Sequence, residues 1–196
     1  MRIQAATKSQ SRPIARLIMQ AMNYDCCQYF AGPHHTLADF ECMMTQLVEE
    51  EDSQYSYRNT LIATENGTDV LGIIVSYDGK DLHRLRRAFI RAAMKHFNQD
   101  FSDMDDETSE GELYLDSLAV SADYRHRGIA TALLQAAIER GRSLNLPAVG
   151  LLVDQGNPSA ERLYTAIGFR FVNNSHWGGH PMRHLQYSLT PTTTKN

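Results

Sequence analysis

The sequence predicts an α/β protein, built as a mixed β-sheet flanked by helices. Short apolar runs of strand length alternate along the chain with amphipathic helical patterns. One of these runs enters a basic, glycine-bearing turn that opens a helix. With 196 residues, the chain is large enough for one domain with its own core. Its hydrophobic content of 42% and charged content of 21% are ordinary for a globular protein.

The first 80 residues predict a strand, two helices and a β-hairpin. Pro13 suits the first turn of a helix that begins after Ser9 or Ser11. Thr36 opens the second helix, and the Asn-Gly dipeptide at 66–67 is a strong signal for a hairpin turn. The expected elements are a strand at 3–5, a helix reaching 22, a loop at 23–33, a helix at 37–48, and strands at 61–63 and 70–75.

Residues 82–110 are interpreted as an insertion made of two oppositely charged parts. Apolar residues recur at helical spacing over 82–97, and basic residues fill the other positions, which predicts a basic amphipathic helix. We expect its charged face to be solvated, with an anion, acidic-partner or RNA surface as the alternative. The acidic stretch that follows has no periodicity and is expected to be a mobile loop. Its carboxylates at 103–110 are suited to attract a cationic substrate.

The C-terminal half alternates strands with helices. Residues 149–153 form a continuous apolar run, as in a strand buried on both faces. Asn157 is a natural N-cap with Pro158 at the first helical position, and Gly168 stands where a left-handed residue ends a helix. The expected elements are strands at 113–120 and 149–153, helices at 127–144 and 158–167, and strands at 169–172 and 185–189 joined by a loop at 173–181.

The stretch 115–131 runs from an apolar strand through a basic turn into a helix. The first N–H groups of a helix lack partners and lie at the positive end of its dipole, so they attract an anion. Gly128 allows a ligand close to the main chain, and the guanidinium groups of Arg125 and Arg127 suit phosphate oxygens. The turn has neither the dinucleotide fingerprint nor a Walker loop. It predicts a di- or polyphosphate site, with an ordinary turn and solvated arginines as the alternative.

Two motifs resemble those of the GNAT acetyltransferase family. Residues 125–130, Arg-His-Arg-Gly-Ile-Ala, resemble the Arg/Gln-x-x-Gly-x-Gly/Ala loop that holds the pyrophosphate of acetyl-CoA. At the family's spacing, residues 157–164 read Asn-Pro-Ser-Ala-x-x-Leu-Tyr, followed by Ile-Gly-Phe at 167–169. The resemblance is specific over 112–169. It implies a single acetyltransferase domain at 1–190 with a mixed, mostly antiparallel central sheet, and a disordered tail at 191–196.

The resemblance implies acetyl-CoA as the cosubstrate. Strand residues would contact the pantetheine arm, turn residues would hold the pyrophosphate through main-chain amides, and Asn157 would contact the CoA arm. A role for Asn157 as an N-cap alone is equally natural. The residues so implied are Leu118, Ala119, Val120, Arg125, His126, Arg127, Gly128, Ile129, Ala130, Thr131 and Asn157.

Two side chains are candidates for catalysis. Tyr164 matches the tyrosine that protonates the leaving thiolate in many family members. A phenol of pKa about 10 is suited to that step because the thiol titrates near 8.5; an ordinary core tyrosine is the alternative. Asp116 is the candidate base, because strand alternation puts it on the face of Leu118 and Val120. It could equally be a buried hydrogen-bonded carboxylate or a substrate ligand.

The identity of the base stays open at the level of sequence. The strand at 149–153 offers no glutamate where other family members have one. Histidine titrates near neutrality, so loop histidines are further candidates. They are His34, His35, His176 and His180. No metal site is expected, because His180 and His184 flank Pro181 and no Cys-x-x-Cys motif accompanies them.

These features predict an N-acetyltransferase that moves an acetyl group directly from acetyl-CoA to a primary amine of a small molecule or peptide, through a ternary complex. A catalytically weak acyl-CoA-binding module for regulation or scaffolding is the alternative. The net charge of −4 argues against a nucleic-acid partner, and no segment has the apolar length of a membrane span. Cys26, Cys27 and Cys42 indicate reduced thiols and a cytoplasmic location. A homodimer is common in the family.

Overall fold

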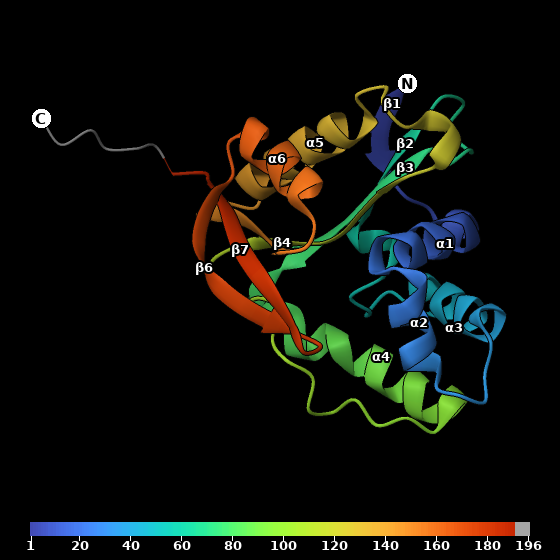
Figure 1. Ribbon diagram of the computed structural model, residues 1–196. Helices are drawn as coiled ribbons and strands as arrows, with labels where there is room; N and C mark the ends of the chain where they lie inside the picture. The colour runs from blue at the N-terminus through green and yellow to red at the C-terminus, as the bar shows by residue number, and fades with distance from the viewer. Residues whose placement is uncertain (191–196) are drawn as a thin grey trace, which may run out of the picture.

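The computed structural model describes residues 1–190 as a seven-stranded sheet with helices on both faces (Figure 1). The strand order is β1-β2-β3-β4-β5-β7-β6. All neighbouring strands are antiparallel except β4 and β5, which are parallel. The predicted mixed, mostly antiparallel α/β fold is therefore confirmed. The tail predicted at 191–196 lies outside the described residues.

Strands and helices follow each other in the predicted order, with one additional helix. The strands are β1 (Arg2–Ala5), β2 (Thr60–Thr64), β3 (Gly72–Asp78), β4 (Leu113–Val120), β5 (Ala148–Asp154), β6 (Arg170–Trp177) and β7 (His180–Ser188). The helices are α1 (Ser11–Met22), α2 (Tyr24–Ala31), α3 (Leu37–Glu49), α4 (Leu82–Phe97), α5 (Ile129–Ser143) and α6 (Pro158–Ile167).

Each face of the sheet has its own apolar core. Helices α1 to α4 cover one face, and α5 and α6 cover the other (Figure 1). Ile14, Phe40 and Phe89 are fully buried on the first face, while Ile74 and Phe169 are fully buried under α5 and α6. Burying a side chain of this size contributes about 1.5–3 kcal/mol, so these two clusters hold the helices against the sheet.

Helix α2 replaces the loop that the sequence predicted at 23–33. Asn23, at φ 65°, ends α1 and its side chain accepts a hydrogen bond from the Cys26 N–H at 2.8 Å. The helix then buries Cys27, Phe30 and Ala31 against the first core. With eight residues, α2 is too short to reveal a 3.6-residue period, which explains the wrong prediction.

A tight hairpin replaces the loop predicted at 173–181. Gly178 and Gly179, with φ values of 58° and 79°, join β6 to β7, as a two-residue turn of type I′ requires. Trp177 pairs with His180 across this turn. The strand residues before it are polar and mostly exposed, and they lack the apolar alternation of a strand. The Gly-Gly dipeptide was the available signal for the hairpin.

Candidate active site

A slot opens in the sheet between β4 and β5. The two strands pair only at Leu113 with Val149 and at Tyr114 with Gly150. Beyond that point β5 stays paired with β7 along its whole length, while β4 stays paired with β3. Over residues 115–120, the edge of β4 on the β5 side therefore has no hydrogen-bonded partner strand among the described residues. Main-chain groups along this edge are available to an extended ligand.

The turn after β4 has the backbone geometry that an anion site at a helix start requires. Gly128 caps α5 with φ 76°, and His126 has φ 60°, so both adopt the left-handed conformation. No heavy atom lies within 4 Å of the position that a Cβ of Gly128 would take. The first N–H groups of α5, from Ile129 on, lie at the positive end of the helix dipole, next to the space that Gly128 leaves open. This geometry fits the pyrophosphate of a CoA molecule.

The two arginines of this turn are exposed, and each donates a hydrogen bond to a main-chain carbonyl of the same segment. Arg125 Nε donates to the Val120 carbonyl at 3.3 Å, and Arg127 Nη2 donates to the Asp123 carbonyl at 3.0 Å. Arg127 also lies over the Tyr124 ring at 5.1 Å. The Val120 carbonyl accepts a second bond from Gln20 Nε2 at 3.1 Å, so that oxygen is already engaged within the protein.

Helix α6 carries the two downstream candidates. The Asn157 side chain accepts a hydrogen bond from the Ala160 N–H at 3.1 Å, as the N-cap prediction requires, and the residue is exposed. Tyr164 is partly buried and meets Phe169 edge to face at 5.9 Å. Burial raises the pKa of Tyr164 to about 12, so its hydroxyl stays protonated at neutral pH and can act as a hydrogen-bond donor.

A β-bulge in β4 changes the expected orientation of Asp116. Val75 pairs with Ser117 but Ser76 pairs with Leu115, so Asp116 is the extra residue of the bulge. Leu118 and Val120 pack against the core under α5. Asp116 instead contacts residues on the side of α4. The prediction that all three share one face was therefore wrong, because an inserted residue breaks the two-residue alternation of a strand.

Asp116 is a partly exposed carboxylate held by neutral donors. Its oxygens accept hydrogen bonds from Ser117 Oγ at 2.7 Å, Tyr77 Oη at 3.3 Å and Gln54 Nε2 at 3.3 Å. Within residues 1–190, no lysine, arginine or histidine forms an ion pair with it. Burial raises the pKa of Asp116, and the three hydrogen bonds and the charge of Arg86 oppose that rise.

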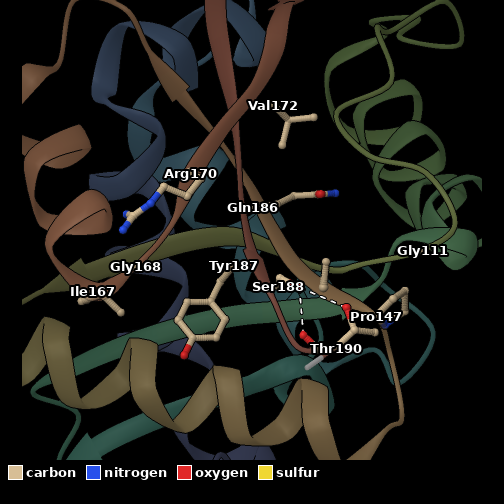
Figure 2. Close-up of a pocket in the computed structure, with 11 residues that line it drawn as sticks. Gly111, Pro147, Ile167, Gly168, Arg170, Val172, Gln186, Tyr187, Ser188 and Thr190 are labelled. Atoms are coloured by element: carbon tan, nitrogen blue, oxygen red, sulfur yellow. Dashed lines mark hydrogen bonds between the residues drawn. The ribbon is translucent and has the colours of Figure 1, made fainter. Parts of the chain in front are cut away.

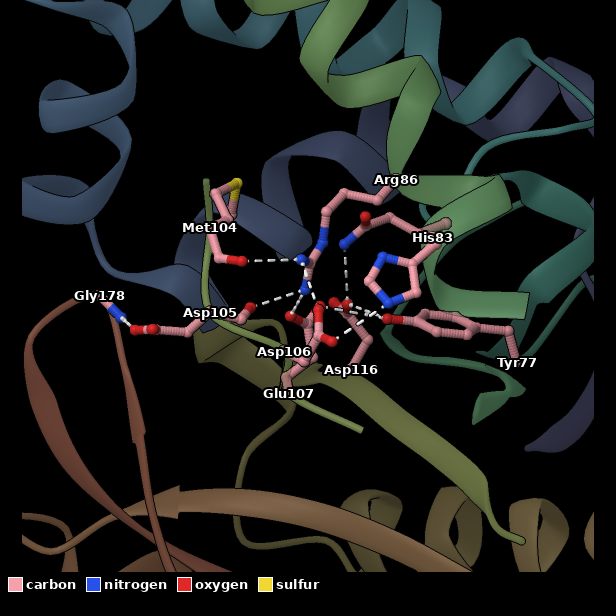
Figure 3. Close-up of polar contacts among 10 residues, drawn as sticks. Tyr77, His83, Arg86, Met104, Asp105, Asp106, Glu107, Asp116 and Gly178 are labelled. Atoms are coloured by element: carbon pink, nitrogen blue, oxygen red, sulfur yellow. Dashed lines mark hydrogen bonds and ion pairs between the residues drawn. The ribbon is translucent and has the colours of Figure 1, made fainter. Parts of the chain in front are cut away.

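A second carboxylate, Glu107, lies behind Asp116 and was missed in the sequence (Figure 3). Its side chain is buried and forms an ion pair with Arg86 of α4, which is buried as well. Arg86 also binds the Met104 and Asp105 carbonyls, at 3.2 and 2.8 Å. The acidic segment is therefore anchored to α4 by one arginine. The prediction of a fully solvated basic face on α4 was wrong at Arg86.

Two residues that contact this pair of carboxylates, Gln54 and Arg86, carry an unpaired buried polar atom. Three buried side-chain atoms in the described part of the chain lack a hydrogen-bond partner: Gln54 Oε1, Ser76 Oγ and Arg86 Nε. Gln54 donates to Asp116, Arg86 binds Glu107, and Ser76 flanks the bulge. The carboxylate requires the NH2 end of the Gln54 amide, which leaves the carbonyl end unpaired. Such a concentration of unpaired groups is typical of a functional site.

A third carboxylate, Glu112, lies in a fully paired environment. It accepts hydrogen bonds from His184 Nε2 at 2.8 Å, Gln186 Nε2 at 2.7 Å and Thr108 Oγ1 at 2.6 Å. Its carboxylate fills the space where a side chain on Gly150 would start, which explains the glycine in β5. Although burial acts to raise it, the pKa of Glu112 is lowered because these hydrogen bonds stabilise the charged form.

Comparison with known proteins identifies the family. The sequence model of the Acetyltransferase (GNAT) family matches residues 30–169. The chain belongs to the GNAT acetyltransferase family. The protein is accordingly an acetyl-CoA-dependent acyltransferase, as the sequence predicted, and acetyl-CoA is the cosubstrate of the family. A search among curated proteins finds no relative.

Solved structures share the GNAT fold. A crystal structure of an acetyltransferase is 27% identical, with a TM-score of 0.80, over 97% of this chain and 100% of the other. An N-acetyltransferase from Staphylococcus aureus Mu50 is 22% identical, with a TM-score of 0.82, over 95% of this chain and 100% of the other. A NatC complex bound to Gag peptide and CoA contains a chain 19% identical, with a TM-score of 0.56, over 97% of this chain and 100% of the other.

Three segments of this GNAT domain meet on the Asp116 side of the slot. Phe30 of α2 lies 4.9 Å from Phe101 and 6.1 Å from Trp177, ring centre to ring centre. The Gly178 N–H at the tip of the β6–β7 hairpin donates to Asp105 of the acidic segment at 3.2 Å. Helix α2, the acidic segment and the β6–β7 hairpin, in which the sequence showed no specific family motif, thus form one wall of the slot.

Among the described residues, the remaining candidates predicted from the sequence form no hydrogen bond or ion pair with Asp116 or Glu107. His34, His176 and His180 are exposed, and His35 Nδ1 bonds the Ala31 carbonyl at 3.1 Å. A separate hollow of about 700 Å³ lies between the start of β5, the end of α6 and β7 (Figure 2). None of the predicted site residues lines it. In the described part of the chain, no helix combines the length and apolar character that crossing a membrane requires.

Proposed function

We propose that this enzyme transfers the acetyl group directly to a primary amine within a ternary complex. The observation that carries the proposal is the slot between β4 and β5, which begins near the bulge at Asp116 and continues toward the phosphate turn at Gly128. Tyr164 packs on the α5 and α6 side of the sheet, and Asp116 lies on the α4 side. A ligand in the slot would meet a donor on one side and an acceptor on the other.

The chain's own groups account for the two proton movements of the reaction. When bound, acetyl-CoA supplies the acetyl group as a thioester. An aliphatic amine has a pKa of about 10.4 and is charged at neutral pH, so it must lose a proton before it can attack. Asp116 binds the ammonium group and accepts that proton. Tyr164, whose hydroxyl is protonated at neutral pH, donates a hydrogen bond and then its proton to the departing sulfur, and it regains a proton from water after CoA leaves.

The cysteines favour direct transfer over an acyl-cysteine enzyme. A thiol attacks as the thiolate, so a nucleophilic cysteine needs a lowered pKa. Burial instead raises the pKa of Cys26 to about 11 and that of Cys27 to about 12. Cys42 is exposed on α3, which covers the first core and lies outside the slot. A two-step route through these thiols is therefore disfavoured.

The test is acetyl-CoA turnover over a panel of small amines and lysine-containing peptides, followed by CoA release and product mass. Tyr164→Phe should lower kcat about 10- to 100-fold with little change in acetyl-CoA affinity, because only proton donation is lost. Tyr187→Phe is the matched control, since Tyr187 meets the same Phe169 ring edge to face at 5.8 Å. Tight acetyl-CoA binding without turnover on any amine would favour the acyl-CoA-binding module instead.

A further inference from the structure

Behind Asp116, the hydroxyl of Tyr77 connects the carboxylates of Asp116 and Glu107 (Figure 3). Tyr77 Oη is 3.3 Å from Asp116 Oδ2 and 3.3 Å from Glu107 Oε1. A phenol has one proton to donate, so it can satisfy only one ionised carboxylate at a time. The other carboxylate must carry a proton, or remain charged without that hydrogen bond.

Exposure separates Asp116 from the two residues behind it. Asp116 is partly exposed, whereas Tyr77 and Glu107 are buried, with 3% and 7% of their surface exposed. An acceptor amine can therefore reach Asp116 and cannot reach Glu107. Arg86 closes the inner end, because it holds the other oxygen of Glu107 and two carbonyls of the acidic segment.

We propose that Tyr77 and Glu107 extend the catalytic centre inward from Asp116, as a relay through which the proton lost by the acceptor amine is stored on Glu107. The relay rests on the proposed amine acetylation and adds to it a residue from the inserted acidic segment. In this role Glu107 and Tyr77 act through Asp116 and do not touch the substrate.

The proton balance of the relay is complete. An N–H bond of the ammonium breaks and the proton joins Asp116 Oδ2, which leaves a neutral amine. That proton then moves to Tyr77 Oη while the hydroxyl proton of Tyr77 moves to Glu107 Oε1. Asp116 and Tyr77 return to their starting forms, and Glu107 becomes a neutral acid. The stored proton leaves between turnovers by the reverse route to water in the slot.

The surroundings of Glu107 suit a temporary proton store. Burial and the negative charge of Asp116 raise the pKa of Glu107, Arg86 opposes the rise, and the result is about 7. The group can therefore gain and lose a proton near neutrality. Other ionisable groups around it are Asp105 and Asp106 on its own segment, His83 on α4, Tyr114 on β4, and Tyr55 before β2.

The competing explanation is that Glu107 only anchors the acidic segment through Arg86. A substitution at Tyr77 distinguishes the anchoring role of Glu107 from the relay role. Tyr77→Phe removes the bridging hydroxyl and leaves the Arg86–Glu107 ion pair untouched. An anchoring role predicts no effect of this change on the pH dependence of the rate, whereas a relay predicts a large one.

The experiment compares kcat and its pH profile, from pH 5.5 to 9, in the wild type, Tyr77→Phe and Glu107→Gln. The wild-type kcat should increase with pH and show an inflection near pH 7, because Glu107 must be ionised to accept the proton. Both variants should lack that inflection, and their kcat should be about 10²-fold lower than that of the wild type. Thermal melting confirms that each variant is folded. Tyr114→Phe and Glu110→Gln are matched controls and should keep the wild-type profile.

Each outcome decides the question. If the wild type acetylates amines while a folded Tyr77→Phe keeps both its rate and its inflection, the relay is wrong and the proposed function stands. If Glu107→Gln fails to fold, Tyr77→Phe alone decides. If the wild type turns over with no amine, the proposed function itself fails, which is a different result from a wild type that works without the relay.

Discussion

Two groups of buried carboxylates lie close together in this protein and behave in opposite ways. Glu112 has three donors, from His184, Gln186 and Thr108, and its pKa is lowered. Glu107 and Asp116 share one tyrosine hydroxyl, and the pKa of each is raised. Burial and then the charges of Glu107, Asp116 and Glu112 raise the pKa of Tyr114, so all three carboxylates act on this residue.

The difference shows that the balance between desolvation, which raises the pKa, and hydrogen bonds or opposite charges, which lower it, sets the state of a buried acid. Glu112 is 2% exposed and Glu107 is 7% exposed, so both are desolvated. Hydrogen bonds stabilise the charge of Glu112 and make it a fixed structural anion. The other group leaves buried polar atoms unpaired on Gln54 and Arg86. A protein tolerates such costs mainly where function requires them.

The largest expected effect is on the rate, at Asp116. Asp116→Asn keeps the size of the side chain and removes the proton acceptor that faces the slot. We expect kcat to fall about 10²- to 10⁴-fold, the usual value of a general base. Steady-state kinetics with a saturating amine measures the loss, and Glu112→Gln is the control that should keep most of the activity. An Asp116→Asn enzyme at wild-type speed would remove Asp116 from the mechanism.

The sequence predicts the parts of this site that depend on local chemistry. The helix start at Gly128, the N-cap at Asn157 and the strand at 113–120 follow from short patterns, because the local backbone decides them. The orientation of Asp116 does not, since a bulge depends on the register with β3. The role of Glu107 is equally hidden, because it stands in an acidic stretch whose other carboxylates, such as Asp103 and Glu110, are exposed.

Long-range packing explains most of what the sequence left out. Arg86 sits among the arginines of a basic helix, and only the fold shows that it alone turns inward to the acidic segment. The meeting of Phe30, Phe101 and Trp177 joins segments that are far apart in the chain. Contacts of this kind leave no periodic trace in a single sequence.

Arg86→Met should have the next largest effect, and the effect should depend on pH. Above pH 7 Glu107 is ionised in the wild type and would lose its ion-pair partner Arg86, which costs about 3–5 kcal/mol of folding free energy. Below pH 6 Glu107 binds a proton and the cost should shrink. The pKa of Glu107 should also rise, because Arg86 holds it down. The inflection in the rate profile would therefore move to higher pH.

Urea unfolding at pH 5.5 and pH 8 measures the stability of this variant, and kcat over the same range measures the inflection. Arg91→Met on the exposed face of α4 is the control, because its ion pair with Glu50 is long, at 3.7 Å, and solvated. Equal destabilisation by Arg86→Met at both pH values would show that Glu107 does not take up a proton in the folded state.

The smallest effect is expected at Glu112. It tests the contrast between Glu112 and Glu107 through the sign of the pH dependence of the folding free energy. Its folded pKa lies below the unfolded value of 4.5, so its stabilisation is present above pH 4.5 and is lost as the pH falls through the folded pKa. Glu112→Gln should cost about 1–3 kcal/mol of folding free energy at pH 6, and the difference from the wild type should disappear in acid.

The pH dependence at Glu107 has the opposite sign, because its raised pKa stabilises the folded state below pH 4.5 and that contribution disappears as the pH rises through about 7. Urea unfolding of both Gln variants from pH 3 to pH 8 measures the two slopes. Parallel slopes would mean that the two groups are alike, and the distinction between a fixed anion and a proton store would then fail.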